Sequence, residues 1–194
     1  MAERISLKSR PLDLVYFLFF LMHIPATLLI DLQAIYPTTM VPKLIAQLPV
    51  FYVQMSGDPL IGGGMGYFGT KETYVWFKTF LFLEAIFQLP VFVLGARALY
   101  KGNRSIYPLL LIYAASTTTT TLPCLSVILT TPLVQTPSSE ALTYVTITPA
   151  QRLLLLSSYL PFFLLPLLMT VDMAMRVSSL VKAGLSAETQ KKTT

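Results

Sequence analysis

Four long apolar stretches constrain this chain more than any other feature of its sequence. Each is long enough, as a helix, to cross about 30 Å of hydrocarbon. Only 12% of the residues are charged, about half of what soluble domains carry. The sequence therefore predicts an all-α, polytopic membrane protein with a four-helix bundle. The expected helices span about 12–34, 73–100, 105–130 and 149–181.

The basic residues predict the orientation of this bundle. Four crossings put both termini on one side of the membrane, and ten of the lysine and arginine residues lie on that side against four on the other. Because basic residues favour the cytoplasmic side, we expect both termini in the cytoplasm. Residues 1–10 then form an N-terminal segment, 11–181 the membrane domain and 182–194 a disordered polar tail. The net positive charge is a topology signal, and no basic stripe points to nucleic acid as a partner.

Each predicted helix contains a proline at middle depth. Proline is tolerated in membrane helices where neighbouring groups satisfy the freed carbonyls. One per helix is consistent with kinked helices splayed around an intramembrane pocket, although membrane helices use more proline in general. The prolines concerned are Pro25, Pro90, Pro123 and Pro161.

The connection between the first two helices has two notable segments. Residues 41–53 are moderately apolar, which favours short interfacial helices. Residues 62–66 are rich in glycine but lack the spacing of a phosphate-binding loop. We expect a flexible loop there.

Ionisable residues within the apolar stretches are candidates for a functional site, because charge in lipid is costly. Glu84 lies deep in the second stretch, and Gln88 follows one turn later on the same helix face. With antiparallel helices, Asp31 and Glu84 reach similar depths, and His23 lies about two turns deeper than Asp31. Asp172 is at helical spacing from Arg176, which predicts an interfacial ion pair.

Two carboxyls in one cavity do not easily both ionise, so one is expected to keep its proton and bond the other. No intramembrane lysine or arginine is well placed to neutralise the remaining charge. The partner of Asp31 and Glu84 could therefore be a ligand, either an amine or a sterol hydroxyl. An alternative is that Asp31 lies in water at the interface.

The single cysteine, Cys124, excludes an internal disulfide and a zinc site, and we expect its side chain to pack against apolar neighbours. We expect neither a metal nor a cofactor.

Segments from all four stretches match one membrane-protein family in order. They include the run LMHIPATLLIDLQA at 21–34, DPL at 58–60, WFKTFLF at 76–82 and FQLP at 87–90. Further matches are Ile112-Tyr113, Pro123, Ser158-Tyr159 and Pro161. The pattern resembles the sigma-2 receptor, or transmembrane protein 97, family. This resemblance implies the EXPERA fold shared with the emopamil-binding sterol isomerase, residence in the endoplasmic reticulum membrane and a homodimer.

The resemblance also implies roles for individual residues. The family's first-helix acid, which pairs with cationic ligands, falls on Asp31, and its protonated second-helix acid falls on Glu84. Sterols, oxysterols and cationic amphiphilic amines are the implied ligands. The pocket tyrosine of the fourth helix is replaced by Phe162, which loses a hydroxyl. The remaining implied positions are His23, Gln88, Thr120, Tyr159 and Phe162 in the pocket and Asp58 as a supporting acid.

Three functions compete. The first is a non-enzymatic sterol-binding protein in sterol homeostasis or trafficking, and the second is a sterol isomerase. We favour binding, because Thr27 stands where the related isomerases carry an acid and the only tryptophan, Trp76, is at a helix end. The third is a quality-control factor that handles mitochondrial precursors, which the sequence does not separate from the first. Lys191 and Lys192 resemble a dilysine retrieval signal of the reticulum.

Overall fold

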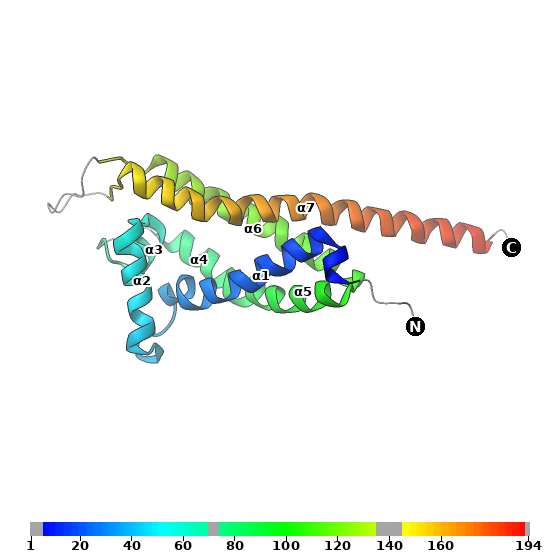
Figure 1. Ribbon diagram of the computed structural model, residues 1–194, viewed down its shortest axis with the longest axis horizontal. Helices are drawn as coiled ribbons and strands as arrows, with labels where there is room; N and C mark the ends of the chain where they lie inside the picture. The colour runs from blue at the N-terminus through cyan, green and yellow to red at the C-terminus, as the bar shows by residue number, and fades with distance from the viewer. Residues whose placement is uncertain (1–5, 70–73, 135–144, 193–194) are drawn as a thin grey trace.

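The computed structural model describes residues 6–69, 74–134 and 145–192 (Figure 1). In these ranges the regular structure is helical, apart from one isolated bridge between Leu133 and Ile147. Four helical segments are long and apolar enough to cross a membrane: Pro11–Ala34, Val75–Lys101, Arg104–Thr130 and Pro149–Lys192. The predicted four-span, all-helical fold is confirmed.

The first span is not one continuous helix. It begins with the 3-10 turn η1 (Leu7–Ser9) and the helix α1 (Pro11–Leu29), breaks at Ile30 and continues as the 3-10 helix η2 (Asp31–Ala34). The break frees carbonyls at the end of α1, and the buried Gln33 amide donates to the carbonyl of Leu29. The side chain of Gln33 thus satisfies a carbonyl at the helix end, which lipid has no hydrogen-bond donor to satisfy. The tighter turn lifts Asp31 out of the α-helical register.

The second span contains a π-helical turn in the middle. The order is α4 (Val75–Leu83), the π-helix η5 (Glu84–Gln88) and α5 (Leu89–Lys101). Pro90 follows this turn and has no N–H to donate, so a widened turn just before it relieves the clash of its ring. The expected start at residue 73 lies outside the described residues. The span ends at Gly102, whose φ of 68° suits a left-handed cap.

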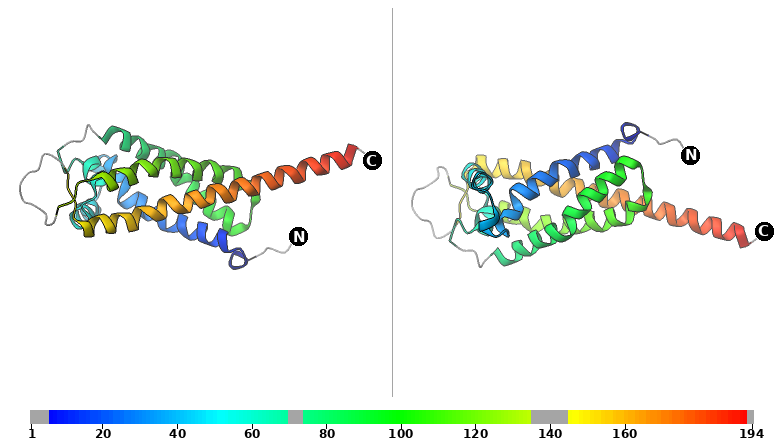
Figure 2. Two further views of the ribbon diagram at one scale, coloured as in Figure 1. Left: turned by 90° about the horizontal axis from the view of Figure 1, so that it is seen from above. Right: turned by 90° about the horizontal axis from the view of Figure 1, so that it is seen from below.

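The third and fourth spans are long helices that lie side by side (Figure 2). They comprise η6 (Arg104–Ile106) with α6 (Tyr107–Thr130), and α7 (Pro149–Lys192). At the start of α7, the Gln151 N–H donates to the Thr148 hydroxyl, and the Thr148 N–H donates to the Gln151 side chain. This reciprocal pair is a capping box, and it fixes the start of the helix.

The expectation of a disordered tail is wrong. The helix α7 continues through residues 182–192, and its residues from Ser178 to Lys192 are exposed. The segment is polar, but it contains no proline, and lysine and alanine make up five of the eleven residues from 182 to 192. These residues lose little side-chain freedom in a helix, so the helix propagates beyond the bundle without packing.

The connection between the first two spans is also more ordered than predicted. It contains η3 (Thr38–Met40), α2 (Lys43–Ser56) and α3 (Pro59–Met65). Residues 41–53 are thus largely helical, whereas the glycine-rich segment is not a flexible loop. Gly62 to Gly64 are buried in α3, and a Cβ atom on Gly63 would lie 2.0 Å from the Tyr74 ring. These glycines allow other side chains to pack closely against α3. A glycine-rich composition is compatible with either close packing or a flexible loop, so composition alone did not distinguish the two.

The helices are arranged so that both chain ends lie at one end of the bundle, the terminal end, and α2 and α3 lie at the other, the α2–α3 end (Figure 1). Pro25, Pro123 and Pro161 are inside α1, α6 and α7, and Pro90 is near the start of α5. α1 packs on α5, and α6 packs on α7. The two helix pairs meet around a fully buried aromatic core that contains Tyr16, Phe20, Phe92 and Tyr113.

An ionic cluster joins the helices at the terminal end. Arg176 contacts Asp172 at 2.8 Å, which confirms that ion pair, and also contacts Asp13 at 2.6 Å. Arg10 pairs with the same Asp13 and donates to the Leu99 carbonyl at 2.8 Å. Asp13 is only 2% exposed, so its two cationic partners compensate its loss of solvation. Asp13 was not singled out from the sequence.

Candidate functional site

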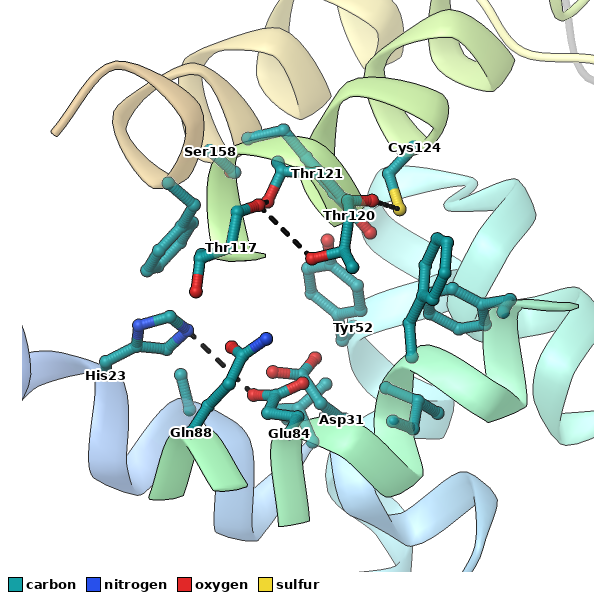
Figure 3. A pocket seen from close by; sticks show the side chains of 17 residues that line it. His23, Asp31, Tyr52, Glu84, Gln88, Thr117, Thr120, Thr121, Cys124 and Ser158 are labelled. Carbon is teal, nitrogen blue, oxygen red and sulfur yellow. Dashed lines mark hydrogen bonds and ion pairs between the residues drawn. The ribbon is translucent and has the colours of Figure 1, made fainter. Parts of the chain in front are cut away.

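A cavity of about 230 Å³ lies among α1, the second span, α6 and α7 in the half of the bundle nearer α2 and α3. Polar groups are gathered inside it, and aromatic and aliphatic side chains form the rest of its wall (Figure 3). Seven residues that the sequence assigned to a ligand pocket line this one cavity. They are His23, Asp31, Glu84, Gln88, Thr120, Tyr159 and Phe162.

The two carboxyls of this cavity come from irregular parts of their spans. Asp31 begins the 3-10 helix η2, and Glu84 begins the π-turn η5 that also carries Gln88. Both carboxyls face the cavity, close enough to repel each other when ionised (Figure 3). Glu84 Oε1 accepts a hydrogen bond from the Thr27 hydroxyl at 2.5 Å. No lysine or arginine is among the described residues that line the cavity.

His23 is held in an aromatic stack at the deeper end of the cavity. Its ring centroid lies 4.5 Å from that of Phe92 and 4.5 Å from that of Phe162. Its Nε2 atom lies 3.9 Å from Glu84 Oε1, beyond a direct hydrogen bond. The Phe162 ring therefore acts as an apolar wall against the imidazole, where a tyrosine would have added a hydroxyl.

Asp58 does not line the cavity but holds part of its wall. Its side chain is fully buried at the start of α3 and accepts from the N–H groups of Leu60 and Ile61 at 2.8 and 3.0 Å. The hydroxyls of Tyr52 and Tyr159 donate to its second oxygen, each at 2.8 Å. Burial raises the pKa of the Asp58 carboxyl, and these four hydrogen bonds oppose the rise. Since both tyrosines line the cavity, the acid fixes their positions.

Several residues that line or support the cavity were not assigned to it from the sequence. Thr27 lies one turn beyond His23 and one turn before Asp31, so helical spacing could have placed it on the same face. Cys124 was expected only to pack, but it lines the cavity and its thiol donates to the Thr120 carbonyl at 3.4 Å. Tyr52 comes from α2, and nothing in the sequence pattern relates that helix to the membrane site.

Two further predictions concern residues away from the cavity. Lys191 and Lys192 are exposed in the last turn of α7, and the residues that follow lie outside the described part of the chain. Among the described residues, no group of three or more histidine, cysteine or acidic side chains could hold a metal ion.

Comparison with known proteins connects this arrangement to one family. Residues 44–173 match the EXPERA domain of the expanded EBP superfamily. The chain is 33% identical to the sigma intracellular receptor 2 of Xenopus tropicalis over 85% of this chain and 89% of that protein. It is 35% identical to the human sigma intracellular receptor 2 over 80% of this chain and 83% of that protein.

Proposed function

This chain belongs to the EXPERA family, the expanded EBP superfamily, and from that premise we propose that it binds lipid-like small molecules in its acidic intramembrane cavity. The ligand classes are cationic amphiphilic amines and sterols or oxysterols. The protein acts as a non-enzymatic binding protein in sterol homeostasis or trafficking. It resides in the endoplasmic reticulum membrane as a homodimer with both termini in the cytoplasm.

One observation carries the proposal: two carboxyls share a cavity whose described lining contains no lysine or arginine. A buried anion without a cationic partner is costly, and an ammonium group supplied by a ligand offsets that cost. Asp31 is the anion that pairs with the ammonium. Glu84 already accepts from Thr27 and supports Asp31 with a proton.

The remaining wall suits the body of an amphiphile. Phe77, Phe80, Leu81 and Phe162 line the cavity beside the carboxyls, so an apolar skeleton is removed from water while its polar head is paired. A sterol hydroxyl satisfies Asp31 by donating a hydrogen bond. The relatives' name, sigma intracellular receptor 2, supports a binding role over catalysis.

Equilibrium binding of one cationic amphiphile and one neutral sterol to the purified protein tests this function. Asp31→Asn is expected to weaken amine binding by about 100-fold, because the charge that attracts the ammonium is gone. The sterol should lose less, since an amide oxygen still accepts from its hydroxyl. Glu188→Gln makes the same chemical change on an exposed part of α7 and should change neither affinity.

Two outcomes would count against the proposal. Unchanged amine binding by Asp31→Asn would remove this carboxyl from the role assigned to it. Failure of the wild-type protein to bind either ligand in a lipid-like environment would reject the binding function itself. Folding of the variant is checked by thermal unfolding, which should be unaffected, because an amide is cheaper to bury than a charge.

A further inference from the structure

The helix α2, which lies outside the four spans, exposes an apolar stripe. Leu44, Phe51 and Met55 are 80%, 67% and 50% exposed, and Leu48 between them is half-buried. These four residues are spaced by four, three and four positions along the sequence, which places their side chains on one side of the helix. Large apolar side chains gathered in this way mark a surface that has an apolar partner.

The other faces of α2 have a different character. The inward face, which includes Pro49 and Val53, is buried against the rest of the protein. Between this buried face and the apolar stripe lies a polar edge, which comprises Lys43, Gln47 and Gln54, all of them exposed. On its other side the apolar stripe borders the buried face directly. A helix with these three faces suits a boundary at which protein, water and hydrocarbon meet.

The helix also lies at the level where the membrane spans end. In Figure 1 α2 runs across the end of the bundle, and in Figure 2 it is seen nearly end-on. The buried Gln33 amide at the end of the first span donates to the carbonyl of Ile45 at 2.9 Å as well as to that of Leu29. Tyr36 follows the first span and Trp76 begins the second, and both residue types concentrate at the membrane–water interface.

The lipid-facing surface of the first span ends beside this helix. Leu28 and Leu29 are each 38% exposed at the end of α1, and α1 contacts α2. A protein partner fits the apolar stripe less well, because a stable protein interface uses about 20–30 residues a side, and the stripe comprises four residues of one helix. Lipid needs no minimum area, since each apolar side chain that enters hydrocarbon contributes separately.

We propose that α2 inserts along its apolar stripe into the membrane leaflet on the α2–α3 side, with the polar edge remaining in water. The partner of this surface is the acyl-chain region of the lipids, and not a second copy of the chain or another protein. Tyr52 lies next to Phe51 on the same helix and lines the ligand cavity. The leaflet and the cavity therefore contact neighbouring faces of α2. The inference does not depend on the proposed binding function.

Spin labels test this placement in the purified full-length protein, reconstituted into phosphatidylcholine nanodiscs. Leu44→Cys and Phe51→Cys carry labels on the apolar stripe, and Gln47→Cys and Gln54→Cys are the matched controls on the polar edge. Oxygen concentrates in hydrocarbon and a nickel chelate stays in water, so the collision rates with the two reagents report depth. The stripe labels should lie about 5–10 Å into the boundary between headgroups and acyl chains, whereas the nickel chelate should reach the edge labels freely. The wild-type protein, whose Cys124 is buried, gives the labelling background.

The four labelled positions are exposed, so thermal unfolding of the variants should match that of the wild type. Met55→Cys supplies a further stripe position if one variant does not fold. Stripe labels that meet the nickel chelate as often as the edge labels do would place the stripe in water and overturn the proposal. Stripe labels protected from both reagents would show that protein covers the stripe, which would overturn it equally. Either result leaves the proposed binding function standing, because no ligand is used.

Discussion

At the scale of single residues, the two acids of the cavity are not equivalent. Glu84 Oε1 accepts from the Thr27 hydroxyl, whereas Asp31 begins the 3-10 helix η2 and faces the cavity. The amide of a Glu84→Gln variant can still accept from Thr27 and can donate toward Asp31. The variant is therefore expected to weaken amine binding by about tenfold or less, against about 100-fold for Asp31→Asn.

Titration of both variants with the same amine, by competition against one labelled ligand, measures this difference. Thr27→Val tests the same contact from the other side and should resemble Glu84→Gln. If Glu84→Gln proved more damaging than Asp31→Asn, the two acids would have to exchange roles.

At the scale of elements, close packing of α5 on α1 and α6 holds together the half of the bundle nearer the terminal end. A Cβ atom on Gly95 would lie 2.8 Å from the Phe20 ring and 2.9 Å from the Leu110 side chain. Both neighbours are fully buried and cannot move freely. Gly95→Ala is expected to destabilise the protein by about 1–3 kcal/mol.

Thermal unfolding in detergent is the measurement, and Gly184→Ala is the control. Gly184 lies on the exposed part of α7, where nothing is within 4 Å of an added Cβ atom, so alanine there should be neutral or slightly stabilising. A melting temperature for Gly95→Ala equal to that of the wild type would contradict the packing of α5 described above.

At the scale of the whole molecule, the four spans place the N-terminus and the end of α7 at the same end of the bundle (Figure 1). The excess of basic residues at that end predicts that it faces the cytoplasm. In reticulum-derived microsomes, tags at either terminus should be digested by added protease without detergent. The sequence Asn103-Arg104-Ser105 matches the acceptor pattern for N-glycosylation and should remain unmodified on the cytoplasmic side. Glycosylation of Asn103 would contradict the assigned orientation.

The enzymatic alternative is also tested at the scale of the whole molecule. A sterol isomerase must deliver and remove protons on both sides of a double bond. In this cavity Thr27, rather than an acid, contacts Glu84, and Trp76 is not among the residues that line the wall. We expect that the protein will not restore sterol synthesis in cells lacking the isomerase. Growth of such cells on expression of this chain, at levels matched to an active isomerase control, would establish catalysis.

The sequence alone determined the membrane class and the number of spans, and with the family pattern it assigned seven of the residues that line the cavity. Apolar length and charge placement are local properties, and lipid allows few backbone structures, so four helices follow directly. Asp31, Glu84 and Gln88 stood out because ionisable and amide groups are rare within apolar stretches. The family pattern then assigned the aromatic and threonine positions around them.

Only the tertiary structure decided which groups satisfy one another. The hydrogen bond from Thr27 to Glu84 and the one that Asp58 accepts from Tyr159 join segments that are distant in sequence. Periodicity specifies which face a residue occupies, but the partner on that face depends on how the helices pack. The same holds for the glycines of α3, where the nearby Tyr74 ring, and not local composition, explains the absence of a side chain.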